Sequence, residues 1–338
     1  MKQNEIISFY GESRLIDLID EVIYSKTGRR LRRDDSFFFN YKYKKERKCL
    51  VLNSDMFNAT TDAPKQMNFY QMGLKSVLMN LSDLVVKGVK PEAIIVSLGL
   101  PNSLPIVSFK RLIEGIVDYS KKWNLNYLGG DLNTSEEIII NPTVFGFKNP
   151  KEIIYRKGIK TGDVLAINNK FGLTGVGFDI LLNKGANVKD FSKYRGAIKS
   201  VLEPNDLGKE AYILANNKLA KASIDSSDGL SKTLKDLNLS NPNLGFEIDF
   251  NDNLIHEKAR EYSKEFSISL EKLIFEGGEE FIHLFAIEPN DFVKAQRLVK
   301  SKGGRLFKVG KAISDENIYF LKKGKRFAIK NQGYEHFK

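Results

Sequence analysis

The sequence predicts a two-layer α/β protein with two domains, each a sheet covered by helices. Three observations predict it: a length of 338 residues of which 42% are hydrophobic, short apolar segments that alternate with amphipathic ones, and a change of pattern near Asn149-Pro150. Chains of this length commonly fold as two domains, and strands that alternate with helices are typical of α/β layers. We therefore expect an N-terminal domain over residues 1–149 and a C-terminal domain over residues 150–338.

The expected first domain alternates strands and helices. Short apolar runs predict strands, and apolar residues at helical spacing predict helices. The first twenty residues have the pattern of an amphipathic helix and lack the apolar core of a signal peptide. There follow a strand over 50–54, a helix over 68–87, a strand over 93–98, a helix over 106–122, a short strand ending at Gly129-Gly130 and a strand over 138–147 broken at Pro142.

The expected second domain begins at Gly162-Asp163. Asp163 stands where a turn enters a strand, so we assign it to that turn. The expected elements are a strand over 164–168, a glycine-rich loop and helix over 171–182, a helix near 205–220, strands over 245–250 and 281–287, a helix over 291–300, and strands near 305–309 and 317–321.

Composition narrows the classes of function. The single cysteine, Cys49, excludes a disulfide framework and a multi-cysteine zinc site. His256, His283 and His336 lie far apart and lack the spacing of metal ligands. No apolar run approaches the roughly 20 residues of a membrane span, so we expect a cytoplasmic protein with no membrane partner. The net charge, 53 − 42 = +11, leaves both an acidic small substrate and nucleic acid open.

The most informative residues are aspartates at the ends of expected strands or in short polar breaks. A single aspartate in such a place is most often a turn or capping residue. If the whole set came together, it would repel itself unless divalent cations were present, and carboxylates are ligands that Mg²⁺ prefers. Phosphoryl transfer needs such clamping by metal ions and little covalent chemistry from the protein. The set is Asp34, Asp35, Asp55, Asp83, Asp131, Asp225 and Asp228.

The sequence has no conventional nucleotide-binding motif. It contains no G-x-x-x-x-G-K-[ST] loop and no set of protein-kinase motifs. The glycines of residues 172–177 do not have the spacing of a dinucleotide-binding loop. An ATP site in this chain must therefore be of another kind.

Eight segments, taken in order, carry a resemblance to a known family. They are DDSFFF (34–39), NSDM (53–56), residues 60–91 with NLSD inside, GGDLN (129–133), YRKGIKTGDVLAI (155–167), IDSSDGL (224–230), EGGEEFIHLF (276–285) and GYEHF (333–337). In this order they resemble the thiamine-monophosphate kinases of the aminoimidazole ribonucleotide synthetase-like superfamily. The resemblance implies an N-terminal domain that forms a homodimer through its sheet and a C-terminal α/β domain. It also implies direct phosphoryl transfer from ATP to thiamine monophosphate, which gives thiamine diphosphate.

The resemblance further implies site residues and several Mg²⁺ ions, and it assigns no side chain as a general base. Arg156 suits phosphate oxygens because it is a permanent cation, and the ring of Tyr334 suits the flat, cationic thiamine part. The implied metal ligands and their neighbours are Asp35, Asn53, Ser54, Asp55, Asp83, Asp131, Asp225 and Asp228. The implied ATP contacts are Gly130, Asp131, Arg156 and Ser227, and the implied thiamine contacts are Asp62, Glu279 and Tyr334.

Four positions depart from the family pattern. Arg33 stands where glycine is usual, Asn53 and Ser54 replace threonines, and Leu132 replaces a threonine after Asp131. Ser54 keeps a hydroxyl, whereas Asn53 and Leu132 each alter one polar contact. No aspartate of the set is missing, so we expect an active enzyme.

Two other classes of protein stand beside this hypothesis: related enzymes of the same fold, and nucleic-acid-binding proteins. A related enzyme such as aminoimidazole ribonucleotide synthetase would share the fold, although IDSSDGL and GYEHF favour the thiamine branch. Selenophosphate synthetase would need a reactive cysteine, whereas Cys49 begins an expected strand. A nucleic-acid-binding protein would use Arg29, Arg30, Arg32, Arg33 and the lysines near 42–48 and 322–325, but such runs are most often solvated surface.

Overall fold

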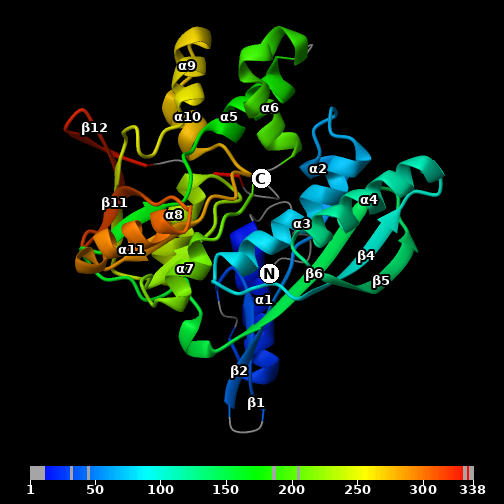
Figure 1. The fold of residues 1–338 in the computed structure, drawn as a ribbon, viewed down its shortest axis with the longest axis horizontal. Coiled ribbons are helices and arrows are strands. Elements are labelled where there is room, and N and C mark those ends of the chain that lie inside the picture. The colour runs from blue at the N-terminus through cyan, green and yellow to red at the C-terminus, as the bar shows by residue number, and fades with distance from the viewer. Residues whose placement is uncertain are drawn as a thin grey trace, which may run out of the picture.

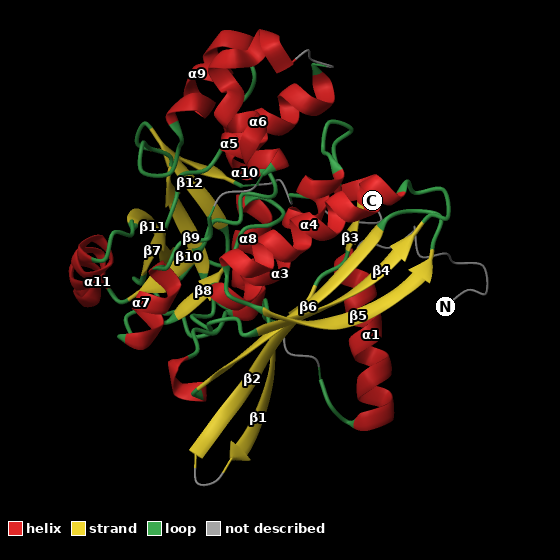
Figure 2. Cartoon of the chain, turned by 45° about the vertical axis from the view of Figure 1, so that its right-hand side comes forward, coloured by secondary structure: helices red, strands yellow, loops and turns green. Residues whose placement is uncertain are grey.

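Two β-sheets with helices packed on them make up the chain (Figures 1 and 2). This computed structural model describes residues 12–30, 33–43, 46–184, 188–203, 206–329 and 333–334. The strands of the first sheet end at Lys148, and those of the second begin at Val164. The predicted α/β class is therefore confirmed. The domain division between residues 149 and 150 stays a prediction, which this separation of the sheets supports.

The first sheet has the strand order β1-β2-β6-β4-β5, and β3 pairs with β6. Its pairs are antiparallel except that of β4 with β5, which is parallel. Helices α3 and α4 lie together on one face (Figure 2). The elements are α1 (Glu12–Thr27), β1 (Phe37–Tyr43), β2 (Glu46–Ser54), β3 (Phe57–Asn58), α2 (Ala59–Asp62), α3 (Phe69–Val85), β4 (Ala93–Leu100), α4 (Ile106–Lys122), β5 (Asn126–Thr134), β6 (Ile139–Lys148) and the short η2 (Pro150–Glu152).

Helix α3 forms where its apolar stripe predicts it. Asn68 caps its first turn, and the side chain of Gln71 bonds back to the main-chain N–H of Asn68, so two otherwise unpaired N–H groups are satisfied. Leu78, Leu81 and Leu84 are fully buried against the sheet. This packing fixes the rotation of the helix and therefore the direction of the polar residues in its last turns.

The opposite face of the first sheet carries exposed apolar side chains. Phe39 on β1, Ile95 on β4 and Phe147 on β6 are all exposed. Their neighbours in sequence, such as Ile94 and Val96, are buried on the helix side, as the alternation along a strand requires. We call this surface the open face.

The second sheet has the order β13-β12-β9-β11-β7-β10-β8 and is antiparallel apart from the β12–β9 pair. Its core is a separate apolar cluster that includes Ile224, Phe246 and Leu284. The elements are β7 (Val164–Ile167), α5 (Leu173–Phe178), η3 (Asp179–Asn183), η4 (Val188–Tyr194), α6 (Arg195–Leu202), α7 (Glu210–Asn216), β8 (Ala222–Ile224), α8 (Leu230–Ser240), β9 (Gly245–Asp249), α9 (Glu257–Phe266), α10 (Leu270–Phe275), β10 (Leu284–Ile287), α11 (Pro289–Ser301), β11 (Phe307–Ile313), β12 (Ile318–Lys322) and β13 (Lys325–Ala328).

Two predicted strand limits in the first sheet are wrong. Strand β5 does not end at Gly129-Gly130 but continues to Thr134, so Asp131 lies within the strand. Strand β6 is not broken at Pro142, which pairs with Val96 of β4. On its other side, Pro142 lies opposite the gap between β2 and β3, where the ladder of hydrogen bonds is interrupted.

Other limits also differ from expectation. The helix near 205–220 is reduced to α7, and the strand over 281–287 begins only at Leu284. Within the described residues, no helix combines the length and the apolar composition that a membrane crossing requires.

Candidate active site

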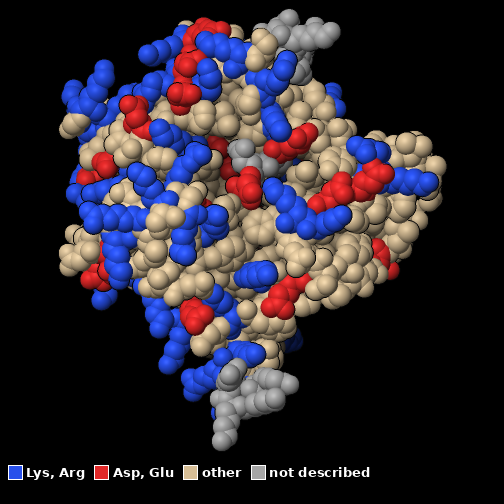
Figure 3. Space-filling view, viewed as in Figure 1, with Lys and Arg blue, Asp and Glu red and all other residues tan. Residues whose placement is uncertain are grey.

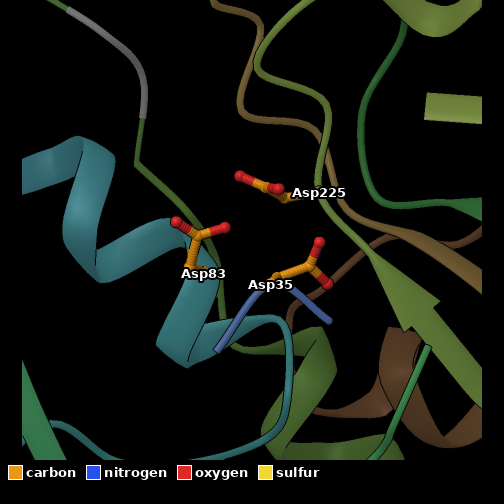
Figure 4. Close-up of side chains that lie close together, drawn as sticks. All are labelled: Asp35, Asp83 and Asp225. Atoms are coloured by element: carbon orange, nitrogen blue, oxygen red, sulfur yellow. The ribbon is translucent and has the colours of Figure 1, made fainter. Parts of the chain in front are cut away.

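Three aspartates from distant parts of the sequence come together where helix α3 meets strand β8. Asp35 lies before β1, Asp83 in the last turn of α3 and Asp225 directly after β8. One carboxylate oxygen of each lies within 4.8 Å of the others, and Figure 4 shows the three side chains around one space. We call this group the acid cluster. Carboxylates this close repel one another unless protons or cations are bound.

Asp83 is positioned by its neighbour on the first sheet. Asn53, near the end of β2, donates from Nδ2 to Oδ2 of Asp83 at 2.7 Å. Burial, and then the negative charges of Asp225, Asp55 and Asp35, raise the pKa of Asp83 well above its usual value. Because Asn53 neutralises no charge, Asp83 takes up a proton or a cation readily.

Asp225 is the most buried carboxylate of the acid cluster. Ser82 donates from Oγ to Oδ2 of Asp225 at 2.5 Å. Burial, and then the charge of Asp35, raise the pKa of Asp225 to about 7, although the bond from Ser82 lowers it. Asp225 is therefore partly protonated near neutral pH.

Asp35 differs from the other two because two cations flank it. The guanidinium of Arg156 bonds to Oδ1, and the ammonium of Lys87 pairs with Oδ2. Burial raises the pKa of Asp35, but Arg156 and Lys87 together outweigh burial, so the pKa lies below its usual value. Asp35 thus stays ionised where Asp225 titrates.

A cavity of about 560 Å³ opens beside the acid cluster, and Asp55, Asp83, Asp225 and Asp228 line it. The loop that carries Asp55 is fixed by Asn80, whose Oδ1 accepts from the N–H of Asp55 at 2.7 Å and whose Nδ2 donates to its carbonyl at 3.0 Å. This part of the cavity offers several carboxylates and is suited to divalent cations.

Asp228 and Ser227 follow Asp225 in the loop after β8 and line the same cavity. Ser227 donates from Oγ to Oδ2 of Asp228 at 3.2 Å. Burial raises the pKa of Asp228 to about 6, although Lys232 lowers it. The main-chain N–H of Tyr334 donates to the carbonyl of Asp228 at 3.1 Å, which ties the C-terminal segment to this loop.

Glu279, Asp62 and Tyr334 line another part of the cavity, beside apolar side chains. Oε1 of Glu279 pairs with Lys75, which also donates to the carbonyl of Asp62 at 2.6 Å. Oε2 is buried and has no hydrogen-bond partner among the described residues. Burial raises the pKa of Glu279 although Lys75 lowers it. The apolar neighbours include Phe178, Leu182, Ile268 and Leu273.

Three predicted site residues lie elsewhere in the single chain. Ser54 does not line the cavity, and its hydroxyl accepts from Thr143 at 2.8 Å. Gly130 and Asp131 line a second, open pocket of about 690 Å³ between α4 and β5. A Cβ atom on Gly130 would lie 1.7 Å from the carbonyl oxygen of Val96, so glycine is required where β4 and β5 approach. Asp131 lies opposite Ser97 in the β4–β5 ladder. Ser97 is exposed between the buried Val96 and Leu98, so Ser97 and Asp131 both point to the open face.

The structure places three further residues that the sequence analysis discussed: Arg33, Cys49 and Asp163. Arg33 pairs with Asp17 of α1 and not with the acid cluster. Cys49 is buried in β2, as an inert thiol would be. Asp163 accepts from the N–H of Lys160 at 2.8 Å, which confirms its place in a turn.

Lys75, Lys87 and Ser82 were not found by sequence analysis. The two lysines are fully buried, and Ser82 is buried too. In the sequence they are simply polar residues within α3 or just after it. Lysines in such places are ordinarily exposed, so nothing in the sequence marked these as buried.

The basic residues of the nucleic-acid hypothesis are partly engaged in ion pairs. Arg30 pairs with Asp20, and Lys322 pairs with Glu271. Arg32 lies outside the described residues. On the face shown in Figure 3, lysine and arginine side chains are interspersed with acidic ones. This distribution is that of a solvated surface.

Comparison with known proteins identifies relatives. The sequence model described as "AIR synthase related protein, N-terminal domain" matches residues 33–147. The thiamine-monophosphate kinase of Nitrosopumilus maritimus is 29% identical over 290 residues, which cover 86% of this chain and 89% of that protein. The thiamine-monophosphate kinase of Methanocaldococcus jannaschii is 31% identical over 278 residues, which cover 79% of this chain and 82% of that protein.

The fold has solved counterparts. The structure of AaThiL complexed with AMPPCP and TMP superposes with a TM-score of 0.81 at 23% identity, and the match covers 99% of this chain and 100% of that chain. With the match of the AIR synthase-related sequence model over residues 33–147, this likeness confirms the predicted aminoimidazole ribonucleotide synthetase-like fold. The 31% identity to the Methanocaldococcus protein over most of both sequences leads to one conclusion: the chain belongs to the thiamine-monophosphate kinase family.

Proposed function

We propose that this chain transfers the γ-phosphoryl group of ATP to thiamine monophosphate and so forms thiamine diphosphate. One observation carries the proposal beyond family membership: a single cavity is lined by the carboxylates beside α3 and β8 and also by Glu279, Asp62 and Tyr334. Thiamine monophosphate has a phosphate at one end, and its cationic thiazolium ring and its pyrimidine ring form the rest of the molecule. The cavity offers a chemically matched surface to each.

The acid cluster fits divalent metal ions. Its donors are hard carboxylate oxygens, and the raised pKa values of Asp83 and Asp225 reflect negative charge that a cation would relieve. When bound, Mg²⁺ would neutralise phosphate oxygens during transfer. The residues that would hold the ions are Asp35, Asp55, Asp83, Asp225 and Asp228, with Asn53 bonded to Asp83.

The side chains around the cluster have distinct tasks in this scheme. Arg156, beside Asp35, supplies a permanent positive charge for phosphate oxygens, and Ser227 supplies a hydroxyl. The acceptor is itself a phosphate monoester, whose second ionisation occurs near pH 6. Its attacking oxygen therefore carries a negative charge at neutral pH, so it can attack without a general base.

The thiamine part would bind against Tyr334 and Glu279. The unpaired Oε2 of Glu279 is available to the positive charge of the ring system, and Lys75 holds Oε1 in place. The aromatic face of Tyr334 can cover the cationic ring. Asp62, fixed through its carbonyl by Lys75, adds a second carboxylate to this region.

We further propose that the enzyme is a homodimer formed through the open face. Phe39, Ile95 and Phe147 give that face an exposed apolar surface, as a subunit interface would need. Asp131 lies on the same face and does not line the cavity beside the acid cluster of its own chain. A dimer could therefore bring Gly130 and Asp131 to the partner's phosphate site. A cytoplasmic location, where ATP is supplied, fits this reaction.

The test is direct. Purified protein is incubated with ATP, Mg²⁺ and thiamine monophosphate, and thiamine diphosphate is separated from the substrate by chromatography. The kinase proposal predicts thiamine diphosphate and ADP in equal amounts. Absence of thiamine diphosphate would leave the related synthetase as the stronger hypothesis. Salt-sensitive binding of RNA or DNA together with no turnover would favour the nucleic-acid hypothesis.

A further inference from the structure

A fully buried lysine lies next to the acid cluster, and the proposed reaction does not use it. Lys87 directly follows the end of α3, in the turn that leads to β4, and its side chain has no exposed surface. Burial of an ammonium group is costly unless the group is paired and its hydrogen bonds are satisfied. We therefore expect the residues around Lys87 to supply negative charge and hydrogen-bond acceptors.

Three oxygen atoms surround the Lys87 ammonium group. Nζ lies 2.7 Å from Oδ1 of Asp34, pairs with Oδ2 of Asp35 and donates to the carbonyl of Ser223 at 2.8 Å. An ammonium group has three donors, and three oxygens surround this one: a carbonyl that accepts a hydrogen bond and two carboxylate oxygens in ion pairs. Lys87 is thus a fixed positive charge and not a mobile one.

These bonds also join three segments of the chain. Asp34 and Asp35 precede β1, Lys87 follows α3, and Ser223 lies in β8 of the second sheet. The link to β8 runs both ways, because Ser223 donates from Oγ to the carbonyl of Val86 at 2.8 Å. Lys87 therefore holds the segment that carries Asp35 against the strand that leads to Asp225.

The charges around the cluster divide into two groups. Asp34 and Asp35 are matched by Lys87 and Arg156, whose main-chain N–H also donates to Oδ2 of Asp34 at 3.0 Å. Asp83 accepts from Asn53 and shares a hydrogen bond with Asp55, and Asp225 accepts from Ser82, so no cation among the described residues is paired with either carboxylate.

We propose that Lys87 is a positioning residue that serves as a built-in cation of the acid cluster. With Arg156 it neutralises Asp34 and Asp35 and holds Asp35 in place before any metal ion binds. Divalent ions are then needed chiefly at the Asp83 and Asp225 side. The inference rests on the proposed function only in taking the acid cluster as a metal site.

The first test measures how strongly Mg²⁺ stabilises a variant without this charge. Thermal unfolding of wild type and Lys87→Met is followed in EDTA and in saturating Mg²⁺. Without Lys87 the metal must offset more negative charge, so the Mg²⁺-induced rise in Tm should exceed that of wild type by about 2–4 °C. Lys90→Met is the matched control, because Lys90 is exposed in the same turn, and its rise should equal that of wild type. An equal or smaller rise in Lys87→Met overturns the proposal.

The second test needs no metal and no activity. In EDTA, Asp34→Asn, Lys87→Met and the double variant are compared with wild type in a thermal-unfolding cycle. The double variant should be more stable than Lys87→Met alone, because the carboxylate left unpaired has been neutralised. If Lys87→Met does not fold, the double variant should fold where the single one fails. A double variant that is no more stable than Lys87→Met overturns the proposal.

The two tests separate this proposal from the kinase proposal. If wild type forms no thiamine diphosphate and is not stabilised by Mg²⁺, the kinase proposal fails, while the EDTA cycle still decides the role of Lys87. If wild type is an Mg²⁺-dependent kinase and both tests give the contrary result, only the role of Lys87 fails.

Discussion

Ser82 donates a hydrogen bond of 2.5 Å from its hydroxyl to Oδ2 of Asp225, and this bond connects the end of helix α3 with the loop after β8. The bond places Asp225, which directly follows β8 of the second sheet, beside Asp83, the residue next to Ser82 on α3. The bond favours the ionised form of Asp225, but burial outweighs it and leaves the pKa at about 7. Proton binding and metal binding thus compete at one buried carboxylate.

The first prediction concerns pH and stability in EDTA. Because the pKa of Asp225 is raised in the folded protein, the folded state binds more protons than the unfolded state between about pH 4 and pH 7. Its contribution to stability is present at the lower pH and is lost as pH rises through about 7. Asp225→Asn removes this titration, so the variant should gain on the order of 1–3 kcal/mol relative to wild type between pH 5 and pH 8.

Thermal unfolding of both proteins across this pH range checks the prediction. His283, whose pKa burial lowers to about 3, and Glu280, whose pKa burial raises to about 7, titrate in both proteins, so their effects cancel in the difference. Asp83 does not cancel: it loses the repulsion of Asp225 in the variant, so its pKa falls and its change adds to the difference in the same direction. A difference in stability that does not change with pH would contradict the account.

The second prediction concerns Asp228 as a metal ligand. Asp228→Asn keeps the shape of the side chain but removes the charge, so kcat should fall on the order of 100-fold. The matched control is Asp163→Asn, which alters another buried aspartate that pairs with Lys221 at 3.2 Å and lies in a structural turn. The control should lower Tm and leave kcat within about twofold. Steady-state kinetics decide it, and a near-wild-type rate for Asp228→Asn would show that the assignment is wrong.

The third prediction concerns Tyr334 and the thiamine part. Tyr334→Ala removes the aromatic face, so KM for thiamine monophosphate should rise about 3–30-fold while KM for ATP stays within about twofold. Tyr334→Phe keeps the ring and should behave almost as wild type. Initial rates with each substrate varied in turn measure both constants. A rise confined to the KM for ATP would refute the stacking role.

The fourth prediction concerns a site shared between subunits. Asp131→Asn and Asp225→Asn should each be nearly inactive alone. In a homodimer whose sites use Asp131 from one subunit and Asp225 from the other, a mixed dimer has one intact site. Refolding the two variants together in equal amounts should therefore restore about a quarter of wild-type activity. No recovery, with mixed dimers demonstrated by two different tags, would place both residues in the same subunit's site.

Much of the fold followed from periodicity in the sequence. Helices α3 and α4 have apolar residues at helical spacing, and strands such as β4 are short apolar runs, so their positions were predicted closely. Strand β5 was cut short because a glycine pair ordinarily ends a strand, whereas here Gly130 allows the close approach to Val96. Pro142 was predicted to break β6, whereas β6 is continuous and the interruption lies in the neighbouring strand position, between β2 and β3. The sequence alone does not show which strands pair with β6.

The site was predicted less completely than the fold. The aspartates were found because their positions in polar breaks and in NLSD and SSDGL stand out in the sequence. That Asp35, Asp83 and Asp225 meet is a tertiary contact between segments far apart in sequence. The buried lysines were missed for the same reason, since only the folded chain shows that Lys75 and Lys87 face carboxylates.

The measurement that tests the central claim most directly is product formation by the purified chain. With ATP, Mg²⁺ and thiamine monophosphate, the account predicts thiamine diphosphate at a rate that falls to background when EDTA is added or when Asp225 is changed to Asn. Thiamine diphosphate formation that persists undiminished in EDTA would contradict the metal-assisted mechanism. No formation under any condition, from a folded protein that binds ATP, would contradict the proposed function itself.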